Sequence, residues 1–482
     1  MLKHIALGSL AGCALFISSI AYGQEYPVHL ISEVMEANPR VTTLAIDFGQ
    51  PLPLMTNLKN AFEVSAELDA VQSYSGQTLG NSGVPAAPRT ILRAYTNDEP
   101  VAGAPRPGNY VILELDSADH NASSWYLGFN PSFRQILPYD DTMTYTVDLL
   151  HDLPAVSEDS SPTEPASQSE TISASAEFVV EGHSIAVVDE FVQGVFELPE
   201  NQDITEISYN FYSPDLEDGA QAPLVIFLHG SGQSHDTNHF PDDITADTLS
   251  PILANQGGVT WIENAPETAF VLAPQAPARD FRDENDLGGW SSAETQQLLN
   301  GLIDEIIADN PGIDTDRIYL TGLSMGAMGS WTLLTNEDPS IADRFAAAVL
   351  MNGRHSQLDE DGSSDLLANL SVPLWLMHAD TDPVVDVEGS RDPFARLTGS
   401  EVSEDGITPD SSVNVDDDEL AITYIGESET SGDEVRYTEY RFGDGSNMLS
   451  LGMVTLNGHF SWETSFKDQE MIEWLFDQAK SE

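Results

Sequence analysis

Two patterns of hydrophobic and polar residues divide the chain. From Tyr26 to about Leu150, short β-like runs are separated by clusters of Pro, Gly and Asn, and no helical periodicity lasts longer than two turns. This texture is typical of strands joined by turns. The candidate strands are Val41 to Phe48, Ala61 to Leu68, Thr90 to Tyr95, Tyr110 to Leu115 and Met143 to Leu149. Their spacing predicts a small all-β sandwich.

After Phe191, apolar strands alternate with amphipathic helices. Leu224 to Leu228 and Phe270 to Ala273 are nearly continuous apolar runs, as expected for parallel strands that are buried on both faces. Further strands are expected at Ile318 to Leu320, Phe345 to Leu350, Pro373 to Met377 and Val435 to Phe442. This order predicts an α/β fold with a doubly wound, mostly parallel sheet.

Two helices of this second half are well marked. Ser291-x-x-Glu294 has the form of a capping box, and apolar residues then recur on one helical face until Asn310-Pro311-Gly312 ends the helix. A closing helix is expected over Gln469 to Gln478.

Polar stretches set the domain limits. Residues Pro154 to Thr171 are rich in Ser, Pro and acids and predict a disordered excursion or linker, and Ser400 to Asp418 is a second such stretch. A chain of 482 residues exceeds what one core usually serves. We therefore expect a sandwich domain over residues 24–187 and an α/β domain over 188–482 with an acidic insertion near 398–434.

The charge balance is strongly acidic. The chain has 79 acidic and 18 basic residues, of which four are lysines, and a formal net charge of −61. Such a surface repels phosphate backbones and anionic headgroups, which argues against nucleic acid and acidic membranes as partners. It indicates solubility in high salt, although part of the charge also fits solvated linkers and loops.

The first 23 residues have the features of an export signal. Lys3 lies in a short n-region, an apolar stretch follows from Ile5 to Ile20, and Ala21-Tyr22-Gly23 forms a small-residue cleavage site. The apolar run is too short for a spanning helix, so we expect a secreted or periplasmic protein without stable membrane insertion. Leu10-Ala11-Gly12-Cys13 also resembles a lipobox, which leaves a lipid anchor on Cys13 as the less favoured alternative. Because Cys13 is the only cysteine, intrachain disulfides, cysteine catalysis and thiolate metal sites are excluded.

The candidate nucleophile is Ser324. Ile318 to Leu323 predicts a strand that runs into Gly322-x-Ser324-x-Gly326 and then into a helix of small residues. This placement fits a strained turn that lifts a serine hydroxyl above the sheet, where only glycines beside it avoid collision.

A serine hydroxyl needs a base, and the base needs a carboxylate to orient it. In this kind of fold the acid and then the histidine follow the serine. Asp382 lies in the loop after the strand Pro373 to Met377, and His459 is the one histidine downstream of it. Asp380 is the alternative acid. His378 and His355 are expected to play structural or pocket-lining parts.

The oxyanion of a tetrahedral intermediate needs two backbone donors. Met325, which follows the nucleophile, would supply one, and Ser231 or Gly232, in the loop after Leu224 to Leu228, the other. We expect His229 to hold this loop rather than to transfer protons. Trp290 is expected to wall the substrate pocket as an exposed aromatic, with a core position as the alternative.

Metal and cofactor signals are weak. The acidic clusters Asp416 to Glu419 and Asp280 to Asp286 lack the regular ligand spacing of a calcium loop, and no phosphate loop, dinucleotide motif or zinc ligand set is present in the sequence. No metal or cofactor is therefore expected.

In combination, several segments resemble bacterial α/β-hydrolase esterases with an N-terminal Ig-like domain, related to the polyhydroxybutyrate-depolymerase and feruloyl-esterase branch. The segments are PLVIFLHGSG (Pro223 to Gly232), FVLAPQ (Phe270 to Gln275), RIYLTGLSMGAMGSW (Arg317 to Trp331), HADTDPVV (His378 to Val385), VRYTEY (Val435 to Tyr440) and IEWLF (Ile472 to Phe476), with a fainter likeness in VTTLAIDFGQPL (Val41 to Leu52) and GNYVILELD (Gly108 to Asp116).

The resemblance implies a triad of Ser324, Asp382 and His459, small-molecule esters with short acyl chains as substrates, and no cofactor. The acidic insertion departs from the family pattern, and because it lies between acid and base we expect it to overhang the site and alter substrate size. Two alternatives remain. One is a depolymerase or feruloyl-type esterase acting on a polymeric ester, and the other is an exported binding or adhesion protein without activity.

Overall fold

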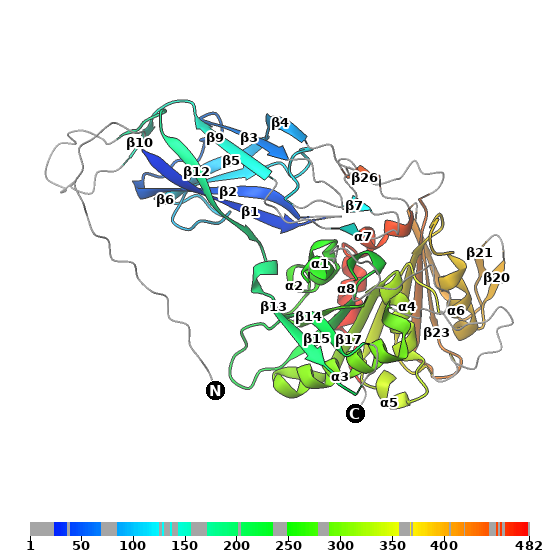
Figure 1. Cartoon of the computed structure of the whole chain (residues 1–482). Coiled ribbons are helices and arrows are strands. Elements are labelled where there is room, and N and C mark those ends of the chain that lie inside the picture. Colours follow the sequence, from blue (N-terminus) through cyan, green and yellow to red (C-terminus); the bar gives the residue numbers. More distant parts are fainter. Residues whose placement is uncertain are drawn as a thin grey trace.

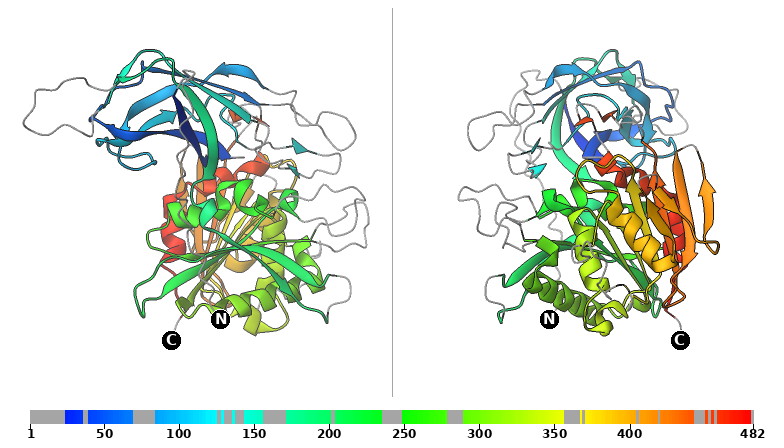
Figure 2. Two further views of the ribbon diagram at one scale, coloured as in Figure 1. Left: turned by 60° about the vertical axis from the view of Figure 1, so that its left-hand side comes forward. Right: turned by 90° about the vertical axis from the view of Figure 1, so that its right-hand side faces the viewer.

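The computed structural model shows a β-sandwich lying over the end of an α/β domain that carries helix α7 (Trp462–Ser465), and two further views agree (Figures 1 and 2). The structure describes residues 24–35, 39–68, 84–124, 128–129, 135–136, 143–155, 171–200, 204–234, 248–277, 289–355, 367, 370–403, 406–418, 420–442, 450–451, 454–455 and 458–480. The expected export signal, the lipobox at Cys13, most of the Ser/Pro-rich excursion and the cluster Asp280 to Asp286 lie outside these residues.

The N-terminal domain is a sandwich of two sheets, with strand orders β12-β1-β2-β6-β5 and β4-β3-β9. Inward residues alternate with outward ones along β1, and the two inner faces share one core. Two separate two-stranded sheets, β7–β8 and β10–β11, also belong to this domain. The strands are β1 (Glu25–Val34), β2 (Pro39–Leu52), β3 (Phe62–Leu68), β4 (Val84–Pro88), β5 (Ile91–Asn97), β6 (Gly108–Leu115), β7 (Gly128–Phe129), β8 (Gln135–Ile136), β9 (Met143–Leu149), β10 (Leu153–Pro154), β11 (Thr171–Ile172) and β12 (Glu177–Ile185).

The expected strands of this domain are all present, within a few residues at their ends. The edge strand β12 and its neighbour β1 were not expected, and these two strands pair in parallel although they are far apart in the sequence.

The second domain is built on one sheet, which has ten strands within the described residues, in the order β13-β14-β16-β15-β17-β18-β19-β24-β23-β22. The six central strands run parallel, and antiparallel strands extend both edges. This is the α/β-hydrolase type of sheet that the sequence predicts. The strands of this domain are β13 (Val192–Glu197), β14 (Glu206–Tyr212), β15 (Ala222–Leu228), β16 (Phe270–Gln275), β17 (Ile313–Leu323), β18 (Ala347–Met351), β19 (Leu374–Ala379), β20 (Glu401–Ser403), β21 (Gly406–Thr408), β22 (Asn414–Asp417), β23 (Ala421–Glu427), β24 (Glu434–Tyr440), β25 (Ser450–Leu451) and β26 (Val454–Thr455).

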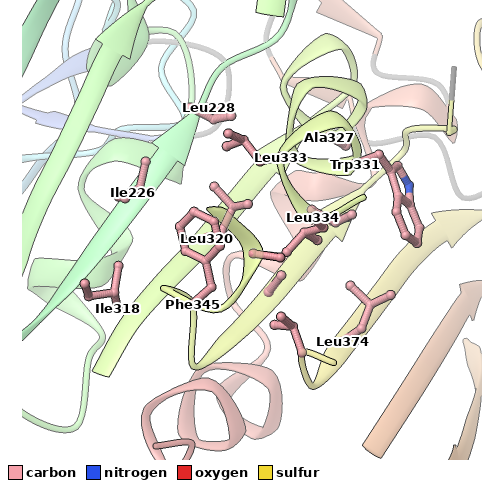
Figure 3. Packing of buried hydrophobic residues seen from close by; sticks show 14 of the residues in the cluster. Ile226, Leu228, Ile318, Leu320, Ala327, Trp331, Leu333, Leu334, Phe345 and Leu374 are labelled. Atoms are coloured by element: carbon pink, nitrogen blue, oxygen red, sulfur yellow. The ribbon is translucent and has the colours of Figure 1, made fainter. Parts of the chain in front are cut away.

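Helices cover both faces of this sheet, and side chains of one strand serve both cores. Along β15, Leu224, Ile226 and Leu228 point to the face covered by α3, α4 and α6, which Figure 3 shows in part. Val225 and Phe227 point to the face covered by α1, α2, α7 and α8. The remaining helices are α1 (Ser250–Leu253), α2 (Thr260–Glu263), α3 (Ala293–Asp309), α4 (Met325–Leu334), α5 (Pro339–Ala342), α6 (Glu388–Thr398), α8 (Gln469–Phe476), and the short 3-10 turns η1 (Val188–Glu190), η2 (Ser231–Gln233), η3 (Gln256–Gly258), η4 (Gly289–Ser291) and η6 (Gly458–Phe460).

Helix α3 begins one residue later than the expected capping box. Ser292 is the N-cap, and its hydroxyl accepts from the backbone N–H of Thr295 at 3.1 Å. The carboxylate of Glu294 instead accepts from the N–H of Ile204, which lies ahead of β14. Ser291 belongs to η4, so the prediction of a Ser291–Glu294 box was wrong by one position.

The stretch from Ser400 to Asp418, expected to be a linker, contains regular structure. It forms the hairpin β20–β21 and the edge strand β22, whose exposed residues carry the acidic side chains. With β23 this insertion lengthens the sheet beyond β24, beside α6 (Figure 1). The described part of the insertion therefore lies at an edge of the sheet.

The two domains share a core. Val34 at the end of β1, Ile185 at the end of β12, and Val188 and Phe191 in the connection pack with the helices on one face of the α/β sheet. The backbone of β8, from the sandwich domain, also lies beside η2 of the α/β domain.

Candidate active site

Ser324 occupies a tight turn between β17 and α4. Its φ of 51° is in the left-handed region, which non-glycine residues rarely adopt. The turn is held by a hydrogen bond from Ser324 N–H to the carbonyl of Met351 on β18. A Cβ on Gly326 would lie 1.9 Å from the carbonyl oxygen of Leu228, and one on Gly322 would lie 2.7 Å from the backbone of Gly326. Both glycines are therefore required for the close approach of strand and helix.

His459 faces the serine from η6, close to the C-terminal end of the chain. Its Nε2 lies 3.0 Å from Ser324 Oγ, and its Nδ1 lies 2.8 Å from Asp382 Oδ2. Because the carboxylate only accepts, Nδ1 carries the proton, and the lone pair on Nε2 is directed at the serine hydroxyl. Ser324 and His459 are 8% and 7% exposed, so both are largely buried and a small part of each residue reaches the surface.

Asp382 follows β19, and its carboxylate accepts five hydrogen bonds. Oδ2 accepts from His459, from His378 Nε2 at 3.1 Å and from Asn352 Nδ2 at 3.2 Å. Oδ1 accepts from the backbone N–H groups of Val384 and Val385. Burial by itself would raise the pKa of Asp382, but the hydrogen bonds from His378 and His459 outweigh it and hold the pKa well below its usual range.

The other candidates lie elsewhere. Asp380 Oδ1 accepts from the N–H of Phe442, beyond the end of β24, so the structure brings Asp382 rather than Asp380 to His459. His355 Nε2 lies 2.9 Å from Thr335 Oγ1, and burial lowers the pKa of His355 to about 4. His378, for which a structural or pocket-lining part was expected, is fully buried, and its Nε2 donates to the carboxylate of Asp382.

The residues expected to bind an oxyanion flank Ser324. Met325 is the first residue of α4, and the first N–H groups of a helix have no partner within the helix. Ser231 and Gly232 begin η2, directly after Gly230, where a Cβ would lie 3.5 Å from Ser324 Cβ. Both residues are partly exposed beside Ser324, as a donor to a substrate oxygen must be.

His229 holds the loop in front of these donors. Its Nδ1 donates to Gly230 O at 2.6 Å, and its Nε2 accepts from Ala276 N–H at 3.0 Å. Burial lowers the pKa of His229 to about 4, so the imidazole is neutral and matches this pair of bonds.

Trp290 is a core residue, and the expectation of an exposed pocket wall was wrong. Its side chain is fully buried on the α3/α4 face of the sheet, and its indole N–H donates to the carbonyl of His229 at 2.9 Å. A Cβ on Gly329 would lie 2.1 Å from Trp290 Cβ, which shows how tightly the indole is packed against α4. Trp290 therefore holds the backbone of His229 in place through this hydrogen bond.

Sequence reasoning missed Asn352. A polar residue directly after a buried strand is a usable signal, because sites in α/β sheets collect at the carboxyl ends of strands. Asn352 directly follows β18, and its amide contacts Asp382.

Within the described part of the chain, no group of three or more His, Cys, Asp or Glu residues is arranged to hold a metal ion. In that same part, no helix is both long and apolar enough to cross a bilayer.

The chain is similar to known esterases in a family match and in a solved structure. Residues 27–162 match the family described as "Esterase Ig-like N-terminal domain". A thermostable esterase of known crystal structure aligns with 94% of this chain and 99% of its own, at 25% identity and a TM-score of 0.64. An S-formylglutathione hydrolase from Agrobacterium tumefaciens aligns with 60% of this chain and 96% of its own, at 13% identity and a TM-score of 0.36. No curated protein sequence matches the chain. The family match and the nearly full-length structural match support an esterase with an N-terminal immunoglobulin-like domain on the α/β-hydrolase fold described above.

Proposed function

We propose that the protein hydrolyses carboxylic esters through an acyl-enzyme formed on Ser324. The observation that supports this most directly is the chain of hydrogen bonds from Ser324 Oγ to His459 Nε2, at 3.0 Å, and from His459 Nδ1 to Asp382 Oδ2, at 2.8 Å. The three residues lie on separate segments, and nothing in the packing of a simple turn requires them to meet. An imidazole between a hydroxyl and a carboxylate is the arrangement that activates a serine.

The reaction follows from these positions. His459 Nε2 takes the hydroxyl proton while Ser324 Oγ bonds to the ester carbon, and the carbonyl oxygen becomes an oxyanion. The N–H of Met325 and that of Ser231 or Gly232 donate to it. When the intermediate collapses, the ester C–O bond breaks and His459 protonates the departing alcohol. Water then attacks the acyl carbon and gives a proton to His459. The bond between the acyl carbon and Ser324 Oγ breaks, His459 returns the proton to Oγ, and the acid is released.

The carboxylate of Asp382 stays in one protonation state during this cycle. Its low pKa leaves it ionised throughout, so it stabilises the imidazolium of His459 without taking a proton. His229, with a pKa near 4, stays neutral and supports the oxyanion loop.

The substrate class that we propose is small esters with short acyl chains, and the site of action is outside the cytoplasm. The first part rests on the resemblance to esterases and the second on the sequence of the first 23 residues. The alternative substrate is a polymeric ester, and the experiments below distinguish it from a small ester.

The test is hydrolysis of p-nitrophenyl esters from acetate to decanoate by the wild type, by Ser324→Ala and by Ser330→Ala. Ser330 is a matched control, because it is a buried serine on α4 whose hydroxyl donates to Gly326 O. We expect activity on short chains, full loss in Ser324→Ala and retention in Ser330→Ala. A Ser324→Ala variant that kept more than about a thousandth of the activity would refute the nucleophile.

Titration with a serine-directed phosphonate completes the test. Labelling of the wild type without turnover of any soluble ester would indicate a polymeric substrate. Failure of both labelling and turnover would favour a protein without catalytic activity.

A further inference from the structure

Asn352 lies at the point where the three strands that carry the site converge. It follows β18, which runs between β17, the strand of Ser324, and β19, the strand of Asp382. Its side chain is fully buried, its φ is 50°, and its backbone N–H donates to the carbonyl of Met377 on β19. Asparagine tolerates this left-handed backbone better than most residues.

The amide of Asn352 makes hydrogen bonds to both loops that form the site. Nδ2 donates to Asp382 Oδ2 at 3.2 Å and to the carbonyl of Gly458 at 3.1 Å, and Oδ1 accepts from the hydroxyl of Ser461 at 2.8 Å. A carboxylate and a backbone carbonyl only accept, so the NH₂ group must face them, and this fixes the orientation of the amide.

His459 lies between the two residues of its loop that Asn352 contacts, Gly458 and Ser461. The same amide also contacts the carboxylate that orients the imidazole. The loop of Asp382 and the loop of His459 are distant in sequence, and one buried side chain thus sets the separation between them. An error of about 1 Å in such a separation can cost about 100-fold in rate.

We propose that Asn352 is a positioning residue for the acid and base of the ester hydrolysis proposed above, and the inference rests on that function. Asn352 acts through Asp382 and His459 and makes no contact with substrate. It should therefore affect kcat and its pH dependence much more than KM.

Two substitutions test different parts of this role. Asn352→Gly keeps the left-handed backbone and removes all three side-chain hydrogen bonds. We expect kcat to fall about 10- to 100-fold, with KM changed by less than about twofold.

Asn352→Asp keeps the shape and still accepts from Ser461, but it replaces the donor with a second carboxylate beside Asp382. The added negative charge favours the imidazolium form of His459, so the acid limb of the kcat–pH profile should move up by about one unit or more.

The control is Asn210→Ala. Asn210 is also a fully buried asparagine, whose Nδ2 donates to the carbonyls of Thr248 and Ala273, but it lies on β14, with β16 and β15 between it and β17. It should lower the melting temperature and leave kcat unchanged. Rates are expressed per serine titrated by a phosphonate, so that only folded sites count and a partly unfolded variant remains informative.

The outcomes separate this inference from the proposed function. Unchanged kcat per titrated site in Asn352→Gly and an unmoved pH profile in Asn352→Asp would overturn the positioning role while Ser324→Ala still abolishes activity. A Ser324→Ala variant with full activity would instead show that the proposed function itself is wrong.

Discussion

Replacing Asp382 by asparagine should disable the base rather than merely weaken it. In the wild type, Oδ1 accepts from two backbone N–H groups, and Oδ2 accepts from His459, His378 and Asn352. If the asparagine oxygen stays with the backbone groups, its NH₂ faces three donors. His459 can then accept from this NH₂ group through Nδ1 only if its own proton moves to Nε2. The proton on Nε2 points at Ser324, so Nε2 no longer offers a lone pair to the serine hydroxyl.

The magnitude follows from this change of tautomer. In serine hydrolases, an asparagine in place of the acid lowers kcat about 10⁴-fold, and we expect a loss on the order of 10³- to 10⁴-fold in Asp382→Asn. Stability should fall as well, since each buried donor left without an acceptor costs about 1–3 kcal/mol. KM should change little, because the carboxylate lies behind the imidazole.

The assay is kcat on a short-chain p-nitrophenyl ester, with Asp380→Asn as the matched control. Asp380 is an aspartate on the same loop, and it accepts from Phe442 N–H instead of from a histidine. It should keep nearly full activity. An Asp382→Asn variant within tenfold of the wild type, or a larger loss in Asp380→Asn, would refute this assignment of the acid.

The same substitution has a signature in stability against pH. The pKa of Asp382 is lower in the folded protein than its unfolded value of about 3.9, so the folded state binds fewer protons. Its contribution is fully present above the unfolded pKa and is lost as the pH falls through the folded pKa. The gap in melting temperature between wild type and Asp382→Asn should therefore narrow below about pH 4.

Three further predictions concern stability. Arg391 pairs with Glu439 through two hydrogen bonds of 2.8 and 2.6 Å, so Arg391→Met should lower the free energy of unfolding in urea by about 3–5 kcal/mol. The double variant Arg391→Met/Glu439→Leu should recover most of this loss, and no recovery would contradict this account. Gly326→Ala should lose about 1–3 kcal/mol, because its methyl group would meet the carbonyl of Leu228, and an unchanged melting temperature would contradict this close approach of strand and helix. Finally, a net charge of −61 predicts that the melting temperature rises from low salt to about 1 M salt, where the screening length is about 3 Å; a fall would show that charge repulsion does not limit stability.

Much of the fold could be predicted because long buried strands carry a strong signal. The apolar runs of β15 and β16 are typical of strands in a sheet that is covered on both faces. The candidate site followed from the order of Ser324, Asp382 and His459, since the chain offers one histidine after that acid. Order along the chain is preserved in this fold even where spacing varies.

The errors have physical causes. The acids of β22 suggested a linker, but an edge strand exposes its side chains and tolerates them there. Trp290 lies next to glycines, which suggested an open loop, whereas Gly289 and Gly329 allow close packing of the indole region against α4. Asn352 gave no motif, because its role depends on two loops that meet only in three dimensions.

The connection between the two domains limits how the enzyme can be divided. Val34, Ile185, Val188 and Phe191 complete the apolar core on one face of the α/β sheet, so cutting at the sequence boundary would leave part of that core open to water. The immunoglobulin-like domain therefore cannot be exchanged for another domain without disturbing this core. A graft of this hydrolase onto another carrier would have to bring the end of β1 and the segment from Ile185 to Phe191 with it, and natural recombination faces the same constraint.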